Sequence, residues 1–405
     1  MRKTGVAKRP CVDASVHLDA IRGIAAVWVL LAHVRVLFMT EGLTALIAGH
    51  AAADRADSSP EPIAISHLRI SSLLGGHATG SRMAVMAFFV LSGYLVGGSA
   101  LNASRKHVFS WSQYLFQRLT RLWVVLIPAL FLCAVFDACG MYLLKSPLYL
   151  IAGPHGGLPV SGHFTLGAFL GSALFLQGIV TSSFGSNGPL WSLSYEFWYY
   201  IFFPLLIAVL SRSRRTSVRV KAGLLLALLL AMSGWKIDAY FLIWLMGAGV
   251  ACLPLRLPRR MRKMSMAAAG FILVAAITLA LRFPINLFCA EFAVGAVFSL
   301  FLWVVLHAQD VSVHPLYRAS AQTLSGMSYT LYLSHFPMLL LLSCVLLPTR
   351  KLWALSAFSL LKLLPVLALV FAASWLVYSC FERNTPAIRN WLRMRFEGKR
   401  AYALR

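Results

Sequence analysis

Long apolar runs alternate with short polar segments along most of the chain. One further stretch, at 164–181, is only weakly apolar. The pattern predicts an all-α polytopic membrane protein with about ten transmembrane helices. The predicted spans lie near residues 18–38, 83–101, 119–141, 189–210, 222–236, 239–255, 264–281, 286–306, 328–348 and 353–380.

The spans define the expected domain organisation. A basic cytoplasmic N-terminus at 1–17 precedes a transmembrane domain over 18–380, and a basic cytoplasmic tail follows over 381–405. Residues 40–82, rich in Ala, Ser, Gly and His, form an expected external loop. The first apolar run carries Arg22 and His33 and lacks a small-residue cleavage site, so we expect a retained helix and not a signal peptide.

The formal charge of +24 first suggests a nucleic-acid partner. With ten spans and an inside N-terminus, however, 26 of the 37 lysines and arginines fall in cytoplasmic segments. The positive-inside rule then accounts for the charge, and we expect no nucleic-acid partner. If 164–181 also crossed the membrane, the basic clusters at 212–221 and 256–263 would face outward. We therefore expect 164–181 to lie at the outer surface, or to enter and leave on one side.

The seven cysteines are scattered and show no CxxC or Cys/His metal-ligand spacing. We expect no disulfide and no metal site from them.

Arg22 and His33 lie eleven residues apart on the first span. Eleven helical steps return to within about 20° of the starting direction and about 16 Å further along the axis, so both side chains share a face with Asp19. Ionisable groups at membrane depth are costly and usually functional. Arg22 is placed to receive an anionic group from the cytoplasm, and His33 to act as a general base. In the alternative, Arg22 only snorkels to the interface and His33 only bonds to backbone.

Two further spans carry polar pairs. Arg118 and Arg121 are three residues apart at the inner end of the third span, and such a pair of guanidinium groups suits phosphate; ordinary positive-inside anchoring is the alternative. Glu196 is the only acid of its span and shares a stripe with Ser192. At similar depth to His33, Glu196 can form a carboxylate–imidazole pair if the helices touch, or it can cap an outer loop.

His335 falls in the inner half of the predicted span that begins with Ser328-Tyr-Thr-Leu-Tyr. The alternative to a functional role is a histidine that is only packed in the core. Ser92 and Gly93, in the second span before Tyr94, permit close helix approach. Glu291 is a further acid within an apolar run, with nothing nearby in sequence to give it a role.

Together these segments resemble acyltransferase family 3, the bacterial integral-membrane O-acyltransferases of surface polysaccharides. The resemblance runs from Leu18 to about Pro386, in six loose motifs that share the family's order and spacing: LDAIRGIAAVWVLLAHV, FFVLSGYL, RLTRLWVVLIPAL, GPLWSLSYEFWYY, SYTLYLSHFP and FERNTP. Many relatives carry an acid just before FFVLSG, where this chain has Met86. The resemblance implies about ten helices in the bacterial plasma membrane with both ends cytoplasmic, a cytoplasmic acyl-CoA donor and a glycan hydroxyl acceptor.

Residues and resemblance together predict a membrane-bound O-acyltransferase that uses acyl-CoA, with acetyl-CoA as the expected donor and a glycan or lipid-linked saccharide as the acceptor. His33 either deprotonates the acceptor or first accepts the acyl group, and Glu196 assists it. The expected CoA-phosphate ligands are Arg22, Arg118 and Arg121, and the expected substrate-binding residues are Trp191, Ser192, Tyr195, Ser92, Tyr94 and His335. The competing class is a transporter or flippase for an anionic solute or glycan precursor. No internal repeat supports that class.

Overall fold

The computed structural model describes residues 12–40, 79–150, 159–254, 257–283, 286–307, 314–348 and 351–403. Over these ranges the chain is almost entirely helical and contains only two isolated β-bridges. Nine of the described helices are long and apolar enough to cross a membrane. The predicted all-α polytopic fold is confirmed.

The long helices follow the predicted spans in order. They are α1 (Val12–Phe38), α4 (Thr79–Ser92) with its continuation α5 (Gly98–Arg105), α6 (Trp111–Ala138), α9 (Trp191–Leu210), α10 (Thr216–Ser233), α11 (Trp235–Val250), α12 (Arg262–Arg282), α13 (Leu287–Val305), α14 (Pro315–Leu346) and α15 (Ala357–Cys380). The predicted span at 239–255 corresponds to α11, which has 16 residues and is not among the nine candidate membrane-crossing helices.

Some element boundaries differ from the predicted ones. The first helix begins at Val12 and not at residue 18, and α4 begins at Thr79. The tail beyond residue 381 continues as a further helix, α16 (Thr385–Ala403). Most of the predicted external loop, residues 41–78, lies outside the described residues.

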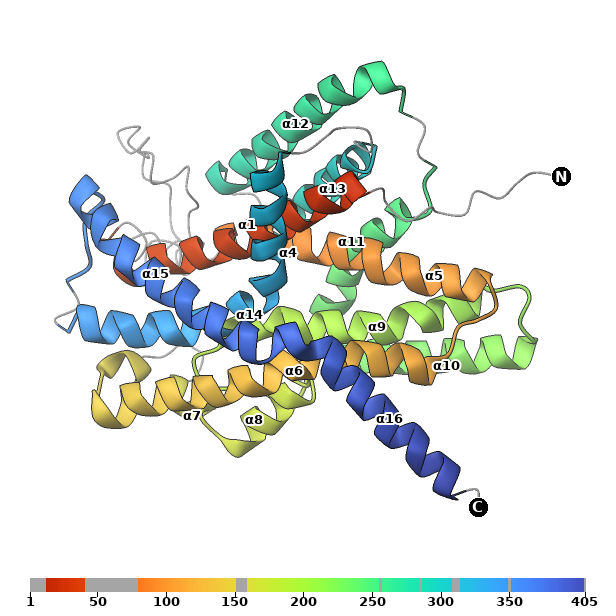
Figure 1. Ribbon diagram of the computed structural model, residues 1–405, viewed down its shortest axis with the longest axis horizontal. Coiled ribbons are helices and arrows are strands. Elements are labelled where there is room, and N and C mark those ends of the chain that lie inside the picture. Colours follow the sequence, from red (N-terminus) through yellow and green to blue (C-terminus); the bar gives the residue numbers. More distant parts are fainter. Residues whose placement is uncertain are drawn as a thin grey trace, which may run out of the picture.

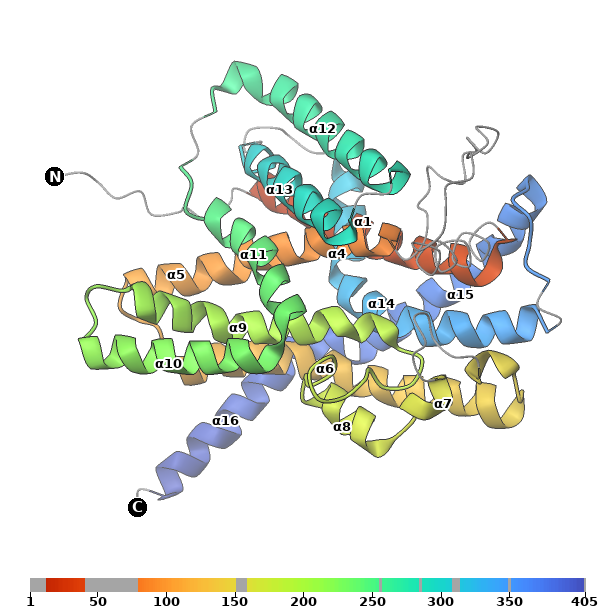
Figure 2. The same cartoon turned by 180° about the vertical axis from the view of Figure 1, so that it is seen from behind.

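In the bundle, α1 packs against both α4 and α14, and α14 also contacts α6 and α15. The helix α12 lies at the edge and packs mainly on α13, while α10 packs on α9. Figures 1 and 2 show that α1 begins and α16 ends toward the same end of the bundle. The side of the membrane that this end faces remains a prediction from the basic segments, and we call it the predicted inner end.

The weakly apolar stretch 164–181 does not form a span, as expected. It contains α8 (Leu166–Ala173), whose eight residues rise only about 12 Å. The chain that follows is anchored to the bundle by buried polar contacts. Gln177 Nε2 donates to the carbonyl of Leu190 at 2.9 Å, and Asn187 Nδ2 to that of Leu333 at 2.8 Å.

The end of α4 and the helix α11 make a close backbone contact. The helix α4 passes into a π-helical segment, Gly93–Gly97, that lies against α11. A Cβ atom on Gly93 would lie 2.0 Å from the carbonyl oxygen of Trp244, and one on Gly247 would lie 2.0 Å from that of Val90. Only glycine allows the backbones to approach this closely, as Ser92-Gly93 suggested, and the π segment sits beside the polar residues described next.

Candidate active site

A cavity with about 890 Å³ of empty space opens between α1, α4, α6, α9 and α14. Its wall is mainly apolar, so the polar groups on it stand out. Six of the predicted site residues line it: Arg22, Ser92, Arg118, Arg121, Ser192 and Glu196. These residues come from four helices and from distant parts of the sequence, and the fold brings them around one space.

The three arginines of the cavity come from the first half of α1 and of α6. Arg22 donates from Nη1 to Ser325 Oγ at 3.2 Å and lies 3.9 Å from Asp19 Oδ1. Arg118 donates from Nη2 to Ser99 Oγ at 3.2 Å, and Arg121 makes no hydrogen bond or ion pair within the described chain. Among the described residues, Asp19 is the one acid that forms an ion pair with these three arginines. The arginine cluster therefore retains excess positive charge.

The guanidinium of Arg118 is held by aromatic rings. Its Cζ lies 5.5 Å from the ring centre of Tyr114 and 5.9 Å from that of Tyr200. Its buried Nε has no hydrogen-bond partner among the described residues. A positioned guanidinium with an unused donor is suited to bind a phosphate oxygen.

Glu196 lies in the interior of the cavity and binds hydroxyl groups. Its Oε1 accepts a hydrogen bond from Ser92 Oγ at 2.7 Å and a short one from Tyr200 Oη. Trp244 Nε1 in turn donates to Ser92 Oγ at 3.1 Å. The proposed pair between Glu196 and His33 is therefore wrong, because α9 directs Glu196 toward α4 and not toward α1.

His33 instead pairs with His335 of α14. His33 Nδ1 and His335 Nε2 are 3.0 Å apart, and His335 Nδ1 lies 2.9 Å from the carbonyl oxygen of Leu331. A carbonyl only accepts, so His335 Nδ1 carries a proton. With His335 neutral, its Nε2 accepts the proton on His33 Nδ1. This chain of hydrogen bonds leaves the lone pair of His33 on Nε2, where a base or nucleophile needs it.

The histidine pair adjoins the cavity through Tyr332. The ring of Tyr332, which lines the cavity, has its centre 6.0 Å from that of His335. Its hydroxyl shares a 2.7 Å hydrogen bond with Ser192 Oγ and donates to the carbonyl of Pro189 at 3.0 Å. Phe88, also on the cavity wall, packs edge-on against Tyr332. Neither histidine lines the cavity itself, and the ring of Tyr332 connects the histidine pair with the cavity wall.

The remaining predicted substrate residues do not line the cavity. Tyr195 is buried and stacks on Phe89, and Tyr94 lies on the π-helical segment. Trp191 is half-buried beside Ser192, with Arg82 4.9 Å from its ring centre. His335 contacts His33 as described above. Of these predicted residues, Trp191 lies against Arg82.

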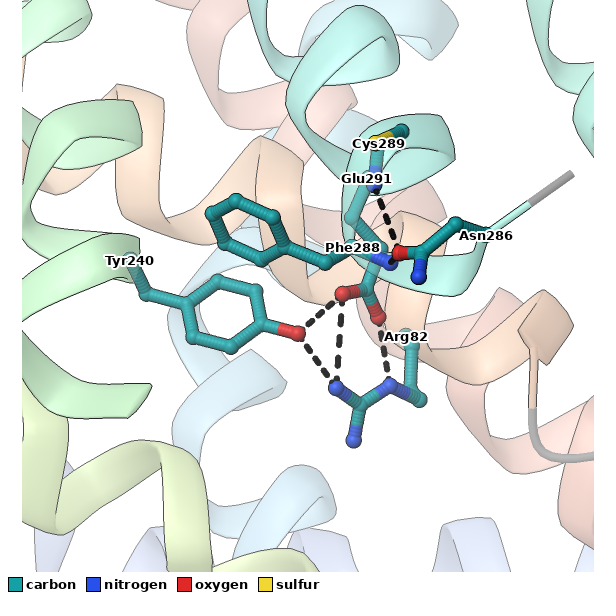
Figure 3. A network of polar contacts seen from close by, with 6 residues as sticks. All are labelled: Arg82, Tyr240, Asn286, Phe288, Cys289 and Glu291. Carbon is teal, nitrogen blue, oxygen red and sulfur yellow. Dashed lines mark hydrogen bonds and ion pairs between the residues drawn. The ribbon is translucent and has the colours of Figure 1, made fainter. Parts of the chain in front are cut away.

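A polar cluster that was not predicted from the sequence lies near the starts of α4, α11 and α13 (Figure 3). The guanidinium of Arg82 donates from Nε and Nη2 to the fully buried carboxylate of Glu291 and also contacts Tyr240 Oη, which itself donates to Glu291. Asn286 caps the same turn of α13 by accepting from the amides of Phe288 and Cys289. The signal that could have found the pair was the buried acid Glu291, because such an acid requires a cation.

The profile of the acyltransferase 3 family, described as an acyltransferase domain, matches residues 16–379. The chain belongs to this family and is therefore a membrane acyltransferase. No curated protein and no solved structure shows a significant match to it.

Proposed function

We propose that this member of the acyltransferase 3 family transfers an acyl group, with acetyl expected, from cytoplasmic acyl-CoA to a hydroxyl of a cell-surface or exported glycan in the bacterial plasma membrane. One observation carries the proposal. Three arginines meet at one part of a membrane-embedded cavity, and the histidine pair adjoins it behind Tyr332 and Phe88.

The arginines support a nucleotide-bearing donor. CoA carries a diphosphate and a 3′-phosphate, and a guanidinium group binds such oxygens by paired, charge-assisted hydrogen bonds. Arg22, Arg118 and Arg121 all lie near the predicted inner end, where a cytoplasmic donor would enter. With the nucleotide held there, the pantetheine arm extends into the cavity toward Ser92 and Glu196.

His33 supplies the reacting group in the proposal, along either of two routes. In direct transfer, Nε2 takes the proton of the acceptor hydroxyl, the oxygen attacks the thioester carbonyl, and the thiolate of CoA leaves and receives that proton. In the covalent route, Nε2 attacks the thioester carbonyl first and the thiolate of CoA leaves. The acceptor oxygen then attacks the acyl-histidine, Nε2 leaves with its lone pair, and the thiolate receives the proton of the hydroxyl. In both routes His33 becomes cationic while His335 continues to accept from Nδ1.

Glu196 and the aromatic residues take supporting roles. Because Glu196 accepts from Ser92 and Tyr200, it fixes their hydroxyls at the cavity wall. We propose that these groups orient the donor thioester, and that Ser192 and Tyr332 orient the acceptor beside His335.

The test uses purified protein in proteoliposomes with radiolabelled acetyl-CoA. The double variant Arg118→Ala/Arg121→Ala is compared with Arg214→Ala/Arg215→Ala, a matched pair of exposed arginines between α9 and α10. Loss of even one charge-assisted hydrogen bond, about 1.5–3 kcal/mol, should raise KM for acetyl-CoA at least about tenfold. The control pair should leave it unchanged.

Two outcomes contradict the proposal. If both double variants shift KM equally, the cavity arginines do not bind the phosphates. If the protein neither hydrolyses acetyl-CoA nor transfers the label, while an anionic solute crosses the proteoliposome membrane, the chain is a transporter.

A further inference from the structure

A second, wholly apolar groove lies on the other side of α4, with about 780 Å³ of empty space. Four helices form it, each with one face of regularly spaced residues. Its lining residues are Ile21, Ile24, Ala25 and Trp28 of α1, Met83, Ala84 and Ala87 of α4, Leu273 and Ile277 of α12, and Val294, Phe298 and Phe301 of α13. Ile21 to Trp28 spans about 10 Å of helix, about a third of the hydrocarbon thickness of a bilayer.

The groove exists because its walls carry small residues and because α12 stands at the edge of the bundle. Ala84 and Ala87 are almost fully buried, yet neither side chain fills the space in front of it. The helix α12 packs mainly on α13 and leaves a gap toward α1. All four helices lie among the candidate spans, so the groove opens at a depth where the surrounding medium is hydrocarbon.

The polar cluster of Figure 3 closes the end of the groove at which α4 begins. Arg82 immediately precedes Met83, and Glu291 stands one turn before Val294 on α13. Trp28 Nε1 donates to the carbonyl of Gly80 at 3.0 Å and ties α1 to the same end. The groove thus runs from a polar end toward the predicted inner end.

Arg82 keeps one part of its guanidinium unused. Nε and Nη2 bind Glu291 and Tyr240, whereas Nη1 makes no hydrogen bond within the described chain and points away from the carboxylate (Figure 3). The side chain of Arg82 is 28% exposed, although that of Glu291 is fully buried. The buried carboxylate neutralises the cation and fixes its direction, so that Nη1 can donate to a neutral oxygen such as a sugar hydroxyl.

We propose that this groove binds the hydrocarbon chain of a lipid-borne saccharide, the acceptor of the acyl group, and that Arg82 and Trp191 hold its first sugar. The inference rests on the proposed function and names its acceptor class. A single chain fits an all-apolar groove that faces the membrane interior, and its polar head then meets the cluster of Arg82, Tyr240 and Glu291 at that end.

The same cluster connects the groove with the active-site cavity. The cation of Arg82 lies over Trp191, the neighbour of Ser192, and Ser192 shares its hydrogen bond with Tyr332 beside the histidines. On α4, Val85 and Phe89 follow Arg82 by one and two turns and line the cavity, while Met83, Ala84 and Ala87 line the groove. A lipid in the groove therefore carries its sugar to the cavity rim without leaving the bilayer.

Photo-cross-linking in proteoliposomes tests the occupant. The probe is a hexadecyl glucoside with a diazirine in its chain, and the comparison probe is a phosphatidylcholine with a diazirine at the same position. We expect the glucoside to label peptides of α1, α4, α12 or α13 that line the groove at least fivefold more than the phosphatidylcholine does. Equal labelling by both probes, or none in the groove, overturns the proposal, because the groove then holds only bulk lipid or nothing.

Three variants sharpen the test. Ile277→Trp fills the groove from the peripheral helix and should reduce glucoside labelling at least fivefold, whereas Ala372→Phe, at an exposed position of α15, should leave it unchanged. Arg82→Lys keeps a cation opposite Glu291 but lacks the free nitrogen, and should reduce glucoside labelling about threefold. Unchanged labelling in Ile277→Trp overturns the groove assignment, and unchanged labelling in Arg82→Lys overturns the role of Arg82.

Acetyl-CoA hydrolysis by the same preparations separates the two proposals. The control variant Ala372→Phe should hydrolyse acetyl-CoA at the wild-type rate, since Ala372 lines neither the cavity nor the groove. If wild-type protein fails to hydrolyse acetyl-CoA yet labels in the groove, the proposed function fails and the lipid site stands. If it hydrolyses acetyl-CoA and does not label, only the acceptor inference fails.

Discussion

Replacing His335 by leucine should slow the acyl transfer without weakening acyl-CoA binding. In the structure, His335 Nε2 accepts from His33 Nδ1 at 3.0 Å, and its ring packs against that of Tyr332 on the cavity wall. Leucine retains most of the volume and loses the acceptor. His33 is then free to turn, or to place its proton on Nε2, where it blocks the reaction.

The magnitude follows from the change in charge on His33. A hydrogen bond between neutral groups contributes about 0.5–1.5 kcal/mol, whereas one to a charged group contributes about 1.5–3 kcal/mol. His33 is neutral in the ground state and cationic in the transition state, so the acceptor favours the transition state by about 1–1.5 kcal/mol. That difference corresponds to about a tenfold loss in kcat.

Release of free CoA thiol by purified protein in proteoliposomes measures kcat and KM directly. His335→Gln is the matched variant, because an amide oxygen can still accept from His33 Nδ1. We expect His335→Leu to lose about tenfold in kcat with little change in KM, and His335→Gln to recover most of it. The reasoning is refuted if leucine and glutamine behave alike, or if KM rises while kcat is preserved.

Three further outcomes follow from the packing and the topology. Gly93→Ala places a Cβ against the carbonyl of Trp244 and should destabilise the protein by about 1–3 kcal/mol in thermal unfolding, whereas Gly249→Ala, with nothing within 4 Å, should not. Glu291→Ala leaves the Arg82 cation unpaired and should cost about 3–5 kcal/mol in the same assay, most of it restored when Arg82 is also replaced by methionine. Arg215→Cys, in a cysteine-free background, should react with an impermeant maleimide only from the cytoplasmic side, and external labelling would contradict the topology.

Periodicity and hydropathy were sufficient for the architecture, because each span is a local property of the sequence. In a bilayer every backbone group must find its partner within the helix, so an apolar run of sufficient length has no other stable form. The distribution of basic residues excluded 164–181 as a span, and the helix found there, α8, has only eight residues. Boundaries were less predictable, since α14 begins with polar turns at Pro315, well before its apolar run.

The features of the site also fall into two groups, those set within a single helix and those set by how the helices pack. The alignment of Arg22 with His33, and of Arg118 with Arg121, follows from helix geometry within one element, and the cavity does contain the three arginines. Which residue meets His33 depends on how α1, α9 and α14 pack. The sequence pattern predicts how deep Glu196 lies along its helix, but it does not predict which neighbouring helix its side chain faces.

The sequence alone therefore determined the class of protein, the order of its helices and the residues at which chemistry was to be expected. The tertiary structure decided the pairings. It brought His33 to His335 rather than to Glu196, because α1 packs along α14. It joined Arg82 to Glu291, which are 209 residues apart, because a buried carboxylate at membrane depth is stable only beside a cation that another helix supplies.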